Sequence, residues 1–498
     1  MNNHIDNKIK VYPIWSRDNT KLILVFILTV VAIYFFPKLG VPQILIKLSF
    51  LFLLFIIFYS KDDVFWISWF FVITNAPGRL FTVTSGSTIY RLPMYTLMSG
   101  VSLGFSELFL IMYIIKYLSR KTKVFSLFNK YAKLIIIYGI FTIAYSFILG
   151  ISQSTLIWSI RLILPWFWLL ILPAFISDPK RIEHSFKLIA PFVFICFILS
   201  IQAQITGEYL HNILSGESVY GFLGEEETDI VRVSHAAHLL FILVFFALFY
   251  LSIERKIFNN TYLNLIIIIG FITILLSATR GWIIAILILF ASVFFMKGYN
   301  LMKQFIRMFV IMAFLIYIVQ VFYPSFLFQI SKSFERLNTL EALTKGDLTA
   351  GGTLARLTER GPRVMSEFYK SPIIGWGFSN YYFAHSDMHV GNQSILLQGG
   401  IIGYLFWIGI FLLIIYNILT YGRLYYVKLS IGSGIYVILF ALIATFAIHS
   451  SSMQMWGFYG SNQATIFHWT YLLTVANAYI SYCKSYVNSY KLKNTVYA

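Results

Sequence analysis

The chain alternates long runs of apolar residues with short polar connections over most of its length. A helix needs about 20 apolar residues to cross the hydrocarbon core of a bilayer, and runs of about that length recur here about fourteen times. The pattern predicts an all-α, polytopic membrane bundle of about 12 to 14 transmembrane helices. A long outer loop between two of the spans is expected to carry short helices.

The candidate spans are continuous apolar segments separated by polar residues. The third is the weakest, because Asn75, Pro77 and Gly78 break it, and its loss would invert the orientation of every later span. The spans lie near 21–37, 42–60, 63–76, 98–118, 132–150, 156–176, 186–204, 235–253, 261–278, 281–296, 304–323, 401–420, 428–448 and 464–482.

Basic residues indicate the orientation, because cytoplasmic loops collect Lys and Arg. If the N-terminal tail, residues 1–20, is cytoplasmic, most of the basic residues fall on the inner side, and so does the C-terminal tail, residues 483–498. This bias supports keeping the third span. Its main contributors are Lys116, Arg120, Lys121, Lys123, Lys130, Lys133, Lys180, Arg181, Lys187, Arg255, Lys256, Lys297, Lys303, Arg307, Arg423, Lys428, Lys484, Lys491 and Lys493.

The same orientation sends two polar segments outward. One is 205–234, and the larger is 324–400, which separates helices 1–11 (residues 21–323) from helices 12–14 (residues 401–482). The larger loop is nearly charge-balanced and rich in aromatic residues. We therefore expect it to pack on the outer membrane surface as short helices.

Composition agrees with a membrane protein, since 59% of residues are hydrophobic, 12% are charged and the mean hydropathy is +0.77. A soluble fold is excluded on these values. The net charge of +18 is explained by topology, so no nucleic-acid partner is expected. Cys196 and Cys483 offer neither a disulfide framework nor a thiolate metal site. The first span reads as a retained anchor and not as a cleaved signal peptide.

Arg161 lies near the middle of the sixth span, where an unpaired charge is costly. It is expected to face the bundle interior. Pairing with Glu107 of the fourth span and contact with a substrate are both open.

Arg280 lies in a tight connection between two apolar runs, within Thr279-Arg280-Gly281-Trp282. That position is at the outer mouth of the bundle. It suits either an interfacial anchor beside Trp282 or an anion site.

His235 and His238 open the eighth span at a spacing that places both on one helix face, and Arg232 precedes them. A metal site is a weak alternative, because no third ligand lies in range. Interfacial packing or substrate contact is the stronger expectation.

The polar block from Arg356 to Gly403 concentrates the remaining candidates. It contains Arg356, Arg360 and Arg363, then Pro372-Ile373-Ile374-Gly375-Trp376-Gly377, then His389 and finally Gly400-Ile401-Ile402-Gly403. Arginines held outside the bilayer are suited to an anion. His389, if neutral, could act as a general base.

This block resembles the conserved region of the O-antigen ligase and O-antigen polymerase superfamily. That family shows an Arg, a Pro-x-x-Gly-x-Gly turn, and a His followed at fixed spacing by Gly-x-x-Gly. Here Val390 follows His389 where the family has a polar residue. Upstream, Thr279-Arg280 is similar to the family's Ser-Arg or Thr-Arg pair, so the match covers roughly residues 277–410.

The resemblance implies a GT-C-like fold and glycosyl transfer on the outer face of the bacterial inner membrane, with an undecaprenyl-diphosphate-linked oligosaccharide as donor. Arg280 and Arg356 would bind the diphosphate, with Arg360 and Arg363 as alternates for Arg356. His389 would activate the acceptor hydroxyl, without a metal or cofactor. A chain-length regulator protein would be a further partner.

Two related activities stay open, and polymerisation of repeat units for O-antigen, capsule or exopolysaccharide is favoured over ligation of the finished glycan to lipid A core or a protein. A flippase or other secondary transporter is the alternative from another class. It is disfavoured because no internal repeat is visible and the candidate residues gather on one side.

Overall fold

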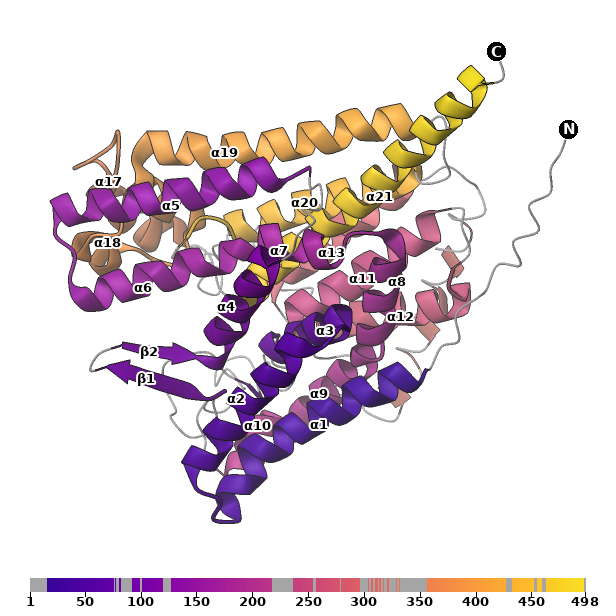
Figure 1. Cartoon of the computed structure of the whole chain (residues 1–498), viewed down its shortest axis with the longest axis horizontal. Coiled ribbons are helices and arrows are strands. Elements are labelled where there is room, and N and C mark those ends of the chain that lie inside the picture. The colour runs from indigo at the N-terminus through magenta and orange to yellow at the C-terminus, as the bar shows by residue number, and fades with distance from the viewer. Residues whose placement is uncertain are drawn as a thin grey trace, which may run out of the picture.

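The computed structural model describes residues 16–75, 77, 80–81, 92–98, 101–119, 127–216, 236–253, 257–277, 279–295, 356–426, 432–451, 455–458 and 463–496, with scattered helical positions between 303 and 331. The fold of these residues is mostly helical (Figure 1). In the first half the elements are α1 (Arg17–Lys38), α2 (Gln43–Tyr59), α3 (Asp63–Thr74), β1 (Met94–Met98), β2 (Val101–Gly104), α4 (Phe105–Leu118), α5 (Asn129–Leu149), α6 (Gln153–Ile163), α7 (Trp168–Phe175), α8 (Pro179–Ile189), α9 (Phe192–Thr206), α10 (Leu210–Ser215) and α11 (Ala237–Ser252).

The second half continues with α12 (Asn260–Leu276) and α13 (Arg280–Ala291), which a 3₁₀ turn, η3 (Ser292–Phe295), extends. A π-helical turn, η4 (Arg356–Arg360), then leads into the polar block. The remaining helices are α17 (Gly361–Phe368), α18 (Asn380–His385), α19 (Gly391–Tyr426), α20 (Gly432–Ser451) and α21 (Gln463–Val496).

Six helical segments among the described residues are long and apolar enough to cross a membrane. They are Arg17–Lys38, Asn129–Leu149, Gln153–Phe175, Pro179–Thr206, Gly391–Tyr421 and Ser433–Ser450. Five shorter apolar helices accompany them: Gln43–Tyr59, Asp63–Thr74, Ala237–Ser252, Asn260–Leu276 and Arg280–Phe295. The predicted helical membrane protein is confirmed at this level, whereas the count of about fourteen spans stays a prediction.

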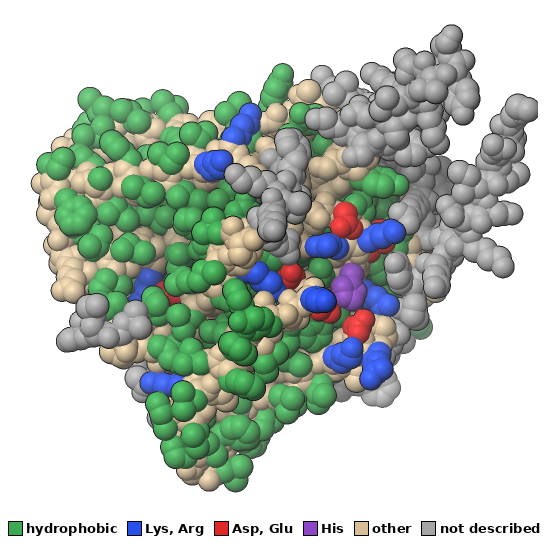
Figure 2. Space-filling model, in the orientation of Figure 1, with side chains coloured by type: hydrophobic (Ala, Val, Ile, Leu, Met, Phe, Trp, Pro, Cys, Tyr) green, Lys and Arg blue, Asp and Glu red, His purple; other side chains and the backbone are tan. Residues whose placement is uncertain are grey.

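The outer surface of several helices is apolar, as a lipid-facing surface requires. Leu28 on α1, Phe52 on α2 and Phe141 on α5 expose 55%, 64% and 66% of their side chains. Figure 2 shows hydrophobic side chains over most of one face. Charged side chains on that face gather in one region, near α8. Because water would penalise so much exposed apolar area, a bilayer is the natural environment of this surface.

Helix α11 is the centre of the bundle. Its residues from Leu239 to Leu248 are at most 1% exposed, as expected of a helix that is hydrophobic on every face. Elsewhere the core is built from aromatic rings. Phe70 and Phe109 stack with centroids 3.9 Å apart, and Trp168 lies 4.6 Å from Phe467. These contacts join α3, α4, α7 and α21, elements that lie far apart in the sequence.

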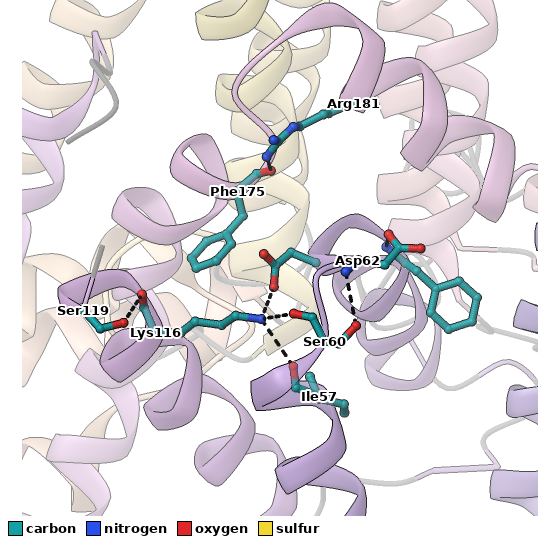
Figure 3. Close-up of polar contacts among 9 residues, drawn as sticks. Ile57, Ser60, Asp62, Lys116, Ser119, Phe175 and Arg181 are labelled. Carbon is teal, nitrogen blue, oxygen red and sulfur yellow. Dashed lines mark hydrogen bonds and ion pairs between the residues drawn. The ribbon is translucent and has the colours of Figure 1, made fainter. Parts of the chain in front are cut away.

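Lys116, at the end of α4, is held inside the protein (Figure 3). Its ammonium lies 2.5 Å from the Asp63 carboxylate and donates to the carbonyl of Ser60 at 2.7 Å. The two side chains of the ion pair are only 14% and 8% exposed. This ion pair therefore connects the start of α3 to the end of α4. In the same view, Arg181 donates to the carbonyl of Phe175, which ties α8 to the end of α7.

The structure replaces the start of one predicted span with a hairpin and extends two helices beyond their predicted bounds. The apolar run before residue 105 forms an antiparallel hairpin, β1–β2, so the expected span at 98–118 begins as a helix only at Phe105. Strands and membrane spans are both apolar, so the composition of this segment did not separate the two. Helix α19 begins at Gly391 and is broken at Gly400, so that its second part starts at the predicted position near 401, and α21 continues as a helix to Val496, past the predicted end of the last span.

Candidate functional site

The polar block of residues 356–403 folds around a break in α19. The break is at Gly400, whose φ of 62° and ψ of −162° are far from helical values. It removes the two helical hydrogen bonds that would join the carbonyls of residues 397–398 to the N–H groups of residues 401–402. These backbone groups need other partners, because buried polar groups are costly when unpaired.

The Pro372–Gly377 turn supplies all four partners. It offers two N–H donors to the freed carbonyls and two carbonyl acceptors to the freed N–H groups. The hydrogen bonds run from Trp376 N to Leu397 O (2.9 Å), Gly377 N to Gln398 O (2.8 Å), Ile401 N to Pro372 O (2.9 Å) and Ile402 N to Ile373 O (3.2 Å). The turn and the helix break are therefore one interlocked structure.

The glycines of this motif are required by backbone geometry. Gly375 and Gly377 have φ values of 67° and 56°, in the region that side chains rarely adopt. A β-carbon on Gly400 would collide with the carbonyl of Ile373. The two glycine motifs found in the sequence thus meet each other in the fold.

The turn is anchored to α5 and to the connection that follows it. The N–H of Phe378 donates to the Ser146 hydroxyl at 2.5 Å. The Asn380 side-chain oxygen accepts from Ser152 N at 3.1 Å and from the Thr155 hydroxyl at 2.7 Å. In Figure 1, α17 and α18 accordingly lie at one end of α5, α6 and α19. The block is fixed to the bundle on two sides.

Tyr138 of α5 lies across the small residues of α19. A β-carbon at either Gly399 or Gly403 would collide with the Tyr138 hydroxyl. Its ring also packs on Phe406, with centroids 4.3 Å apart. Gly403 therefore allows close approach of two helices, while Gly400 provides the break.

Asp387 brings together two of the predicted arginines. Its carboxylate lies 2.9 Å from the guanidinium of Arg363 and 3.6 Å from that of Arg360. The same carboxylate accepts the backbone N–H of His389 at 2.9 Å. Asp387 is 10% exposed, whereas Arg360 and Arg363 are 43% and 63% exposed. The predicted base and two of the predicted diphosphate ligands therefore share one anchor.

Helix contacts show that Arg280 lies at the end of the bundle where α20 ends. At the other end, Phe295 lies 5.8 Å from Tyr436, so the end of η3 meets the start of α20. A β-carbon on Gly434 would touch Phe249, so the end of α11 meets the start of α20 as well. The starts of α11 and α13, including Arg280, therefore lie toward the end of α20.

His238 and Arg280 lie toward this end of the bundle, which is formed by the end of α20 and the starts of α11, α13, α19 and α21. His238 lies 4.7 Å from Trp282 and 5.4 Å from His468, between ring centroids. The end of α20 touches the start of α19 through a hydrogen bond from Asn392 to Ser450. The His389 loop, which directly precedes α19, thus opens on the same end as Arg280.

Arg161 has a structural partner. Its Nε lies 2.8 Å from the Glu107 carboxylate, and a second guanidinium nitrogen donates to the carbonyl of Ser102. The predicted pairing of α6 with α4 is confirmed. The contact with a substrate stays a prediction, and the ion pair explains why the charge is tolerated within a predicted span.

Three predicted residues cannot be placed by their side chains. Arg232 and His235 lie outside the described residues, as does the acidic Glu225–Glu227 cluster. Arg356 opens η4, but its side chain is outside the described part. The weak alternative of a metal at His235 and His238 is therefore untested.

Glu367 organises the other side of the block. Hydrogen bonds from Lys370 and Tyr381 hold the pKa of the Glu367 carboxyl below its usual value. In return, the hydrogen bond to Glu367 and then that to Tyr381 raise the pKa of Lys370. The ring of Tyr381 stacks on Trp376, with centroids 4.0 Å apart. This network braces the turn without using the three arginines.

Sequence reasoning missed Asp387 and His449. Asp387 was counted only as one charge in a balanced loop, although an Asp two residues before a candidate base is a signal for a local side-chain-to-backbone bond. His449 is 1% exposed at the end of α20. Its Nδ1 accepts the N–H groups of Met455 and Trp456 at 3.0 and 3.3 Å, and Gly391 packs on its ring. His449 therefore packs directly against the first residue of α19.

Within the described ranges, no three His, Cys, Asp or Glu side chains lie together as metal ligands would. No protein-family model matches this chain, and no curated protein matches it either. The site geometry and the sequence motifs are therefore the basis for a functional proposal.

Proposed function

We propose that this chain is a membrane glycosyltransferase whose donor is a glycan linked through a diphosphate to undecaprenol. Polymerisation of repeat units is the favoured reaction. The observation that carries the proposal is the shared anchor at Asp387, which holds Arg360 and Arg363 beside the loop of His389. The position of Arg280 toward the same end of the bundle supports it.

The proposed chemistry needs an acceptor hydroxyl, a base and an anion site. The hydroxyl oxygen attacks the anomeric carbon of the donor while its proton passes to the imidazole of His389. The bond from that carbon to the diphosphate oxygen breaks, and its electron pair leaves with the diphosphate. Guanidinium groups of Arg280, Arg360 and Arg363 stabilise the charge that develops there. Arg356 is the fourth candidate for this role.

The membrane surface fits such a donor. A polyprenyl chain is soluble only in the bilayer, and the exposed apolar faces of α1, α2 and α5 suit immersion in it. The polar block is attached at one end of α5, α6 and α19, where a headgroup could meet it. On the predicted topology this end faces outward, toward the periplasm or cell exterior.

The test is the surface polysaccharide of a deletion strain complemented with variants, resolved by gel. His389→Ala and the Arg360→Gln/Arg363→Gln pair should each lower long-chain glycan by a factor on the order of 100 or more, as expected for loss of a general base or of charge stabilisation. Arg181→Gln is the matched control, because Arg181 is an exposed arginine paired with Asp178 outside the block.

The glycan that accumulates distinguishes the activities. Single repeats on the lipid A core indicate a missing polymerase, whereas polymer retained on undecaprenyl diphosphate with a bare core indicates a missing ligase. A transporter is separated by incubating the purified protein in detergent with lipid-linked repeat units. Elongation there requires an enzyme, and full activity of every variant would remove the mechanism.

A further inference from the structure

The acid in the Asp387 cluster lies beneath the cations. Asp387 is 10% exposed, while Arg360 and Arg363 extend into solvent with 43% and 63% exposure. Both guanidinium groups are therefore accessible to a ligand from outside. Each is directed to the same, mostly buried Asp387 carboxylate.

Asp387 has more hydrogen bonds to the fold than its exposed arginine partners need to break. The backbone of Asp387 is bonded at both ends to the Ser394 hydroxyl, which accepts from Asp387 N at 3.2 Å and donates to Asp387 O at 2.6 Å. Ser394 is fully buried in the first turns of α19. An arriving anion would therefore move the long arginine side chains and leave the carboxylate in place.

An exchange of anions is physically favourable at such a site. Ion pairs of exposed arginines are weak, because water competes with them. A diphosphate has more charge than a carboxylate and more oxygens that can accept paired guanidinium hydrogen bonds. The carboxylate can hold the arginines when the site is empty but cannot retain them against a diphosphate.

We infer that Asp387 is an internal stand-in for the diphosphate: it holds Arg360 and Arg363 in the empty site, releases them to the substrate and takes them back when the diphosphate product leaves. This inference rests on the proposed function, because it assigns a role within the same anion site. It predicts that Asp387 opposes anion binding while it assists turnover by promoting release of the product.

The experiment measures binding of inorganic pyrophosphate to the purified full chain in detergent by calorimetry. Asp387→Asn should tighten binding by about three- to tenfold, the scale of losing one or two exposed ion pairs as competitors. The Asn side-chain oxygen can still accept the N–H of His389, so the loop is preserved. Arg363→Gln should weaken binding. Glu367→Gln, which removes a carboxylate bonded to Lys370, should leave it unchanged.

In the glycosyl-transfer reaction, Asp387→Asn should lower KM and kcat together, whereas loss of structure alone would lower kcat with KM unchanged or raised. A thermal unfolding curve identifies any variant that fails to fold, and Asp387→Ala provides a second substitution. Unchanged or weaker pyrophosphate binding in folded Asp387 variants overturns the inference. If pyrophosphate binds none of the variants, the anion site and the proposed function fail with it.

Discussion

Gly375 lies against the backbone of Gly400, so close that a β-carbon on Gly375 would come within 2.5 Å of the Gly400 nitrogen. Both residues have positive φ, at 67° and 62°. The turn and the helix break can therefore interlock only when both positions lack a side chain.

Gly375→Ala should destabilise the protein by about 3 kcal/mol, the sum of a disfavoured backbone conformation and an overpacked contact. Thermal unfolding in detergent measures the change. Gly409→Ala is the control on the same helix, since a β-carbon at Gly409 would have no atom within 4 Å. Equal stability of the two variants would mean that the turn does not clamp α19.

Arg161 and Glu107 should behave as a structural pair. Loss of either partner leaves a charge in a poorly solvated position, so Arg161→Met and Glu107→Gln should each cost about 2 to 3 kcal/mol. The combined variant should recover part of this loss. A double-mutant cycle on unfolding temperature gives the coupling. If the combined variant is stable but inactive, Arg161 also contacts the substrate.

Lys116→Met should strand the Asp63 carboxylate at the start of α3 and cost about 2 kcal/mol or more. Lys21→Met is the comparison, because Lys21 and its partner Asp18 are 55% and 45% exposed. That variant should change stability by less than about 0.5 kcal/mol. The measurement is the unfolding temperature of each purified variant, and similar values would contradict a buried pair.

Stability should depend on pH through Glu367. Because its pKa is lower in the folded protein, it contributes stability above the pKa of the unfolded chain and loses that contribution as pH falls through the folded value. Lys370 has a raised pKa in the folded protein, so it contributes stability below the pKa of the unfolded chain. It loses that contribution as pH rises through the folded pKa. The difference in melting temperature between wild type and Glu367→Gln should therefore be present at pH 7 and shrink toward pH 3. A constant difference would assign the effect to packing.

Much of the site was predictable, because a charged group that is costly to bury must have a partner. A guanidinium within an apolar span requires a carboxylate, and Glu107 is that carboxylate in the structure. The glycine motifs correctly marked the segments in which the backbone turns. Their interlock was not predictable, because it depends on which hydrogen bonds a break at Gly400 removes. The ion pair of Lys116 with Asp63 was not predictable either, because a lysine near the end of a span indicates topology and does not identify its partner.

The break in α19 also makes its first turns a lever. From Gly400 to Gly391 the helix spans nine residues, about 13 Å, so a tilt of about 10° at the pivot would move the His389 loop by about 2 Å. Displacements of that size are enough to separate reacting atoms. The four backbone hydrogen bonds from the Pro372–Gly377 turn hold the pivot, so they also set the position of the His389 loop at the far end of this lever.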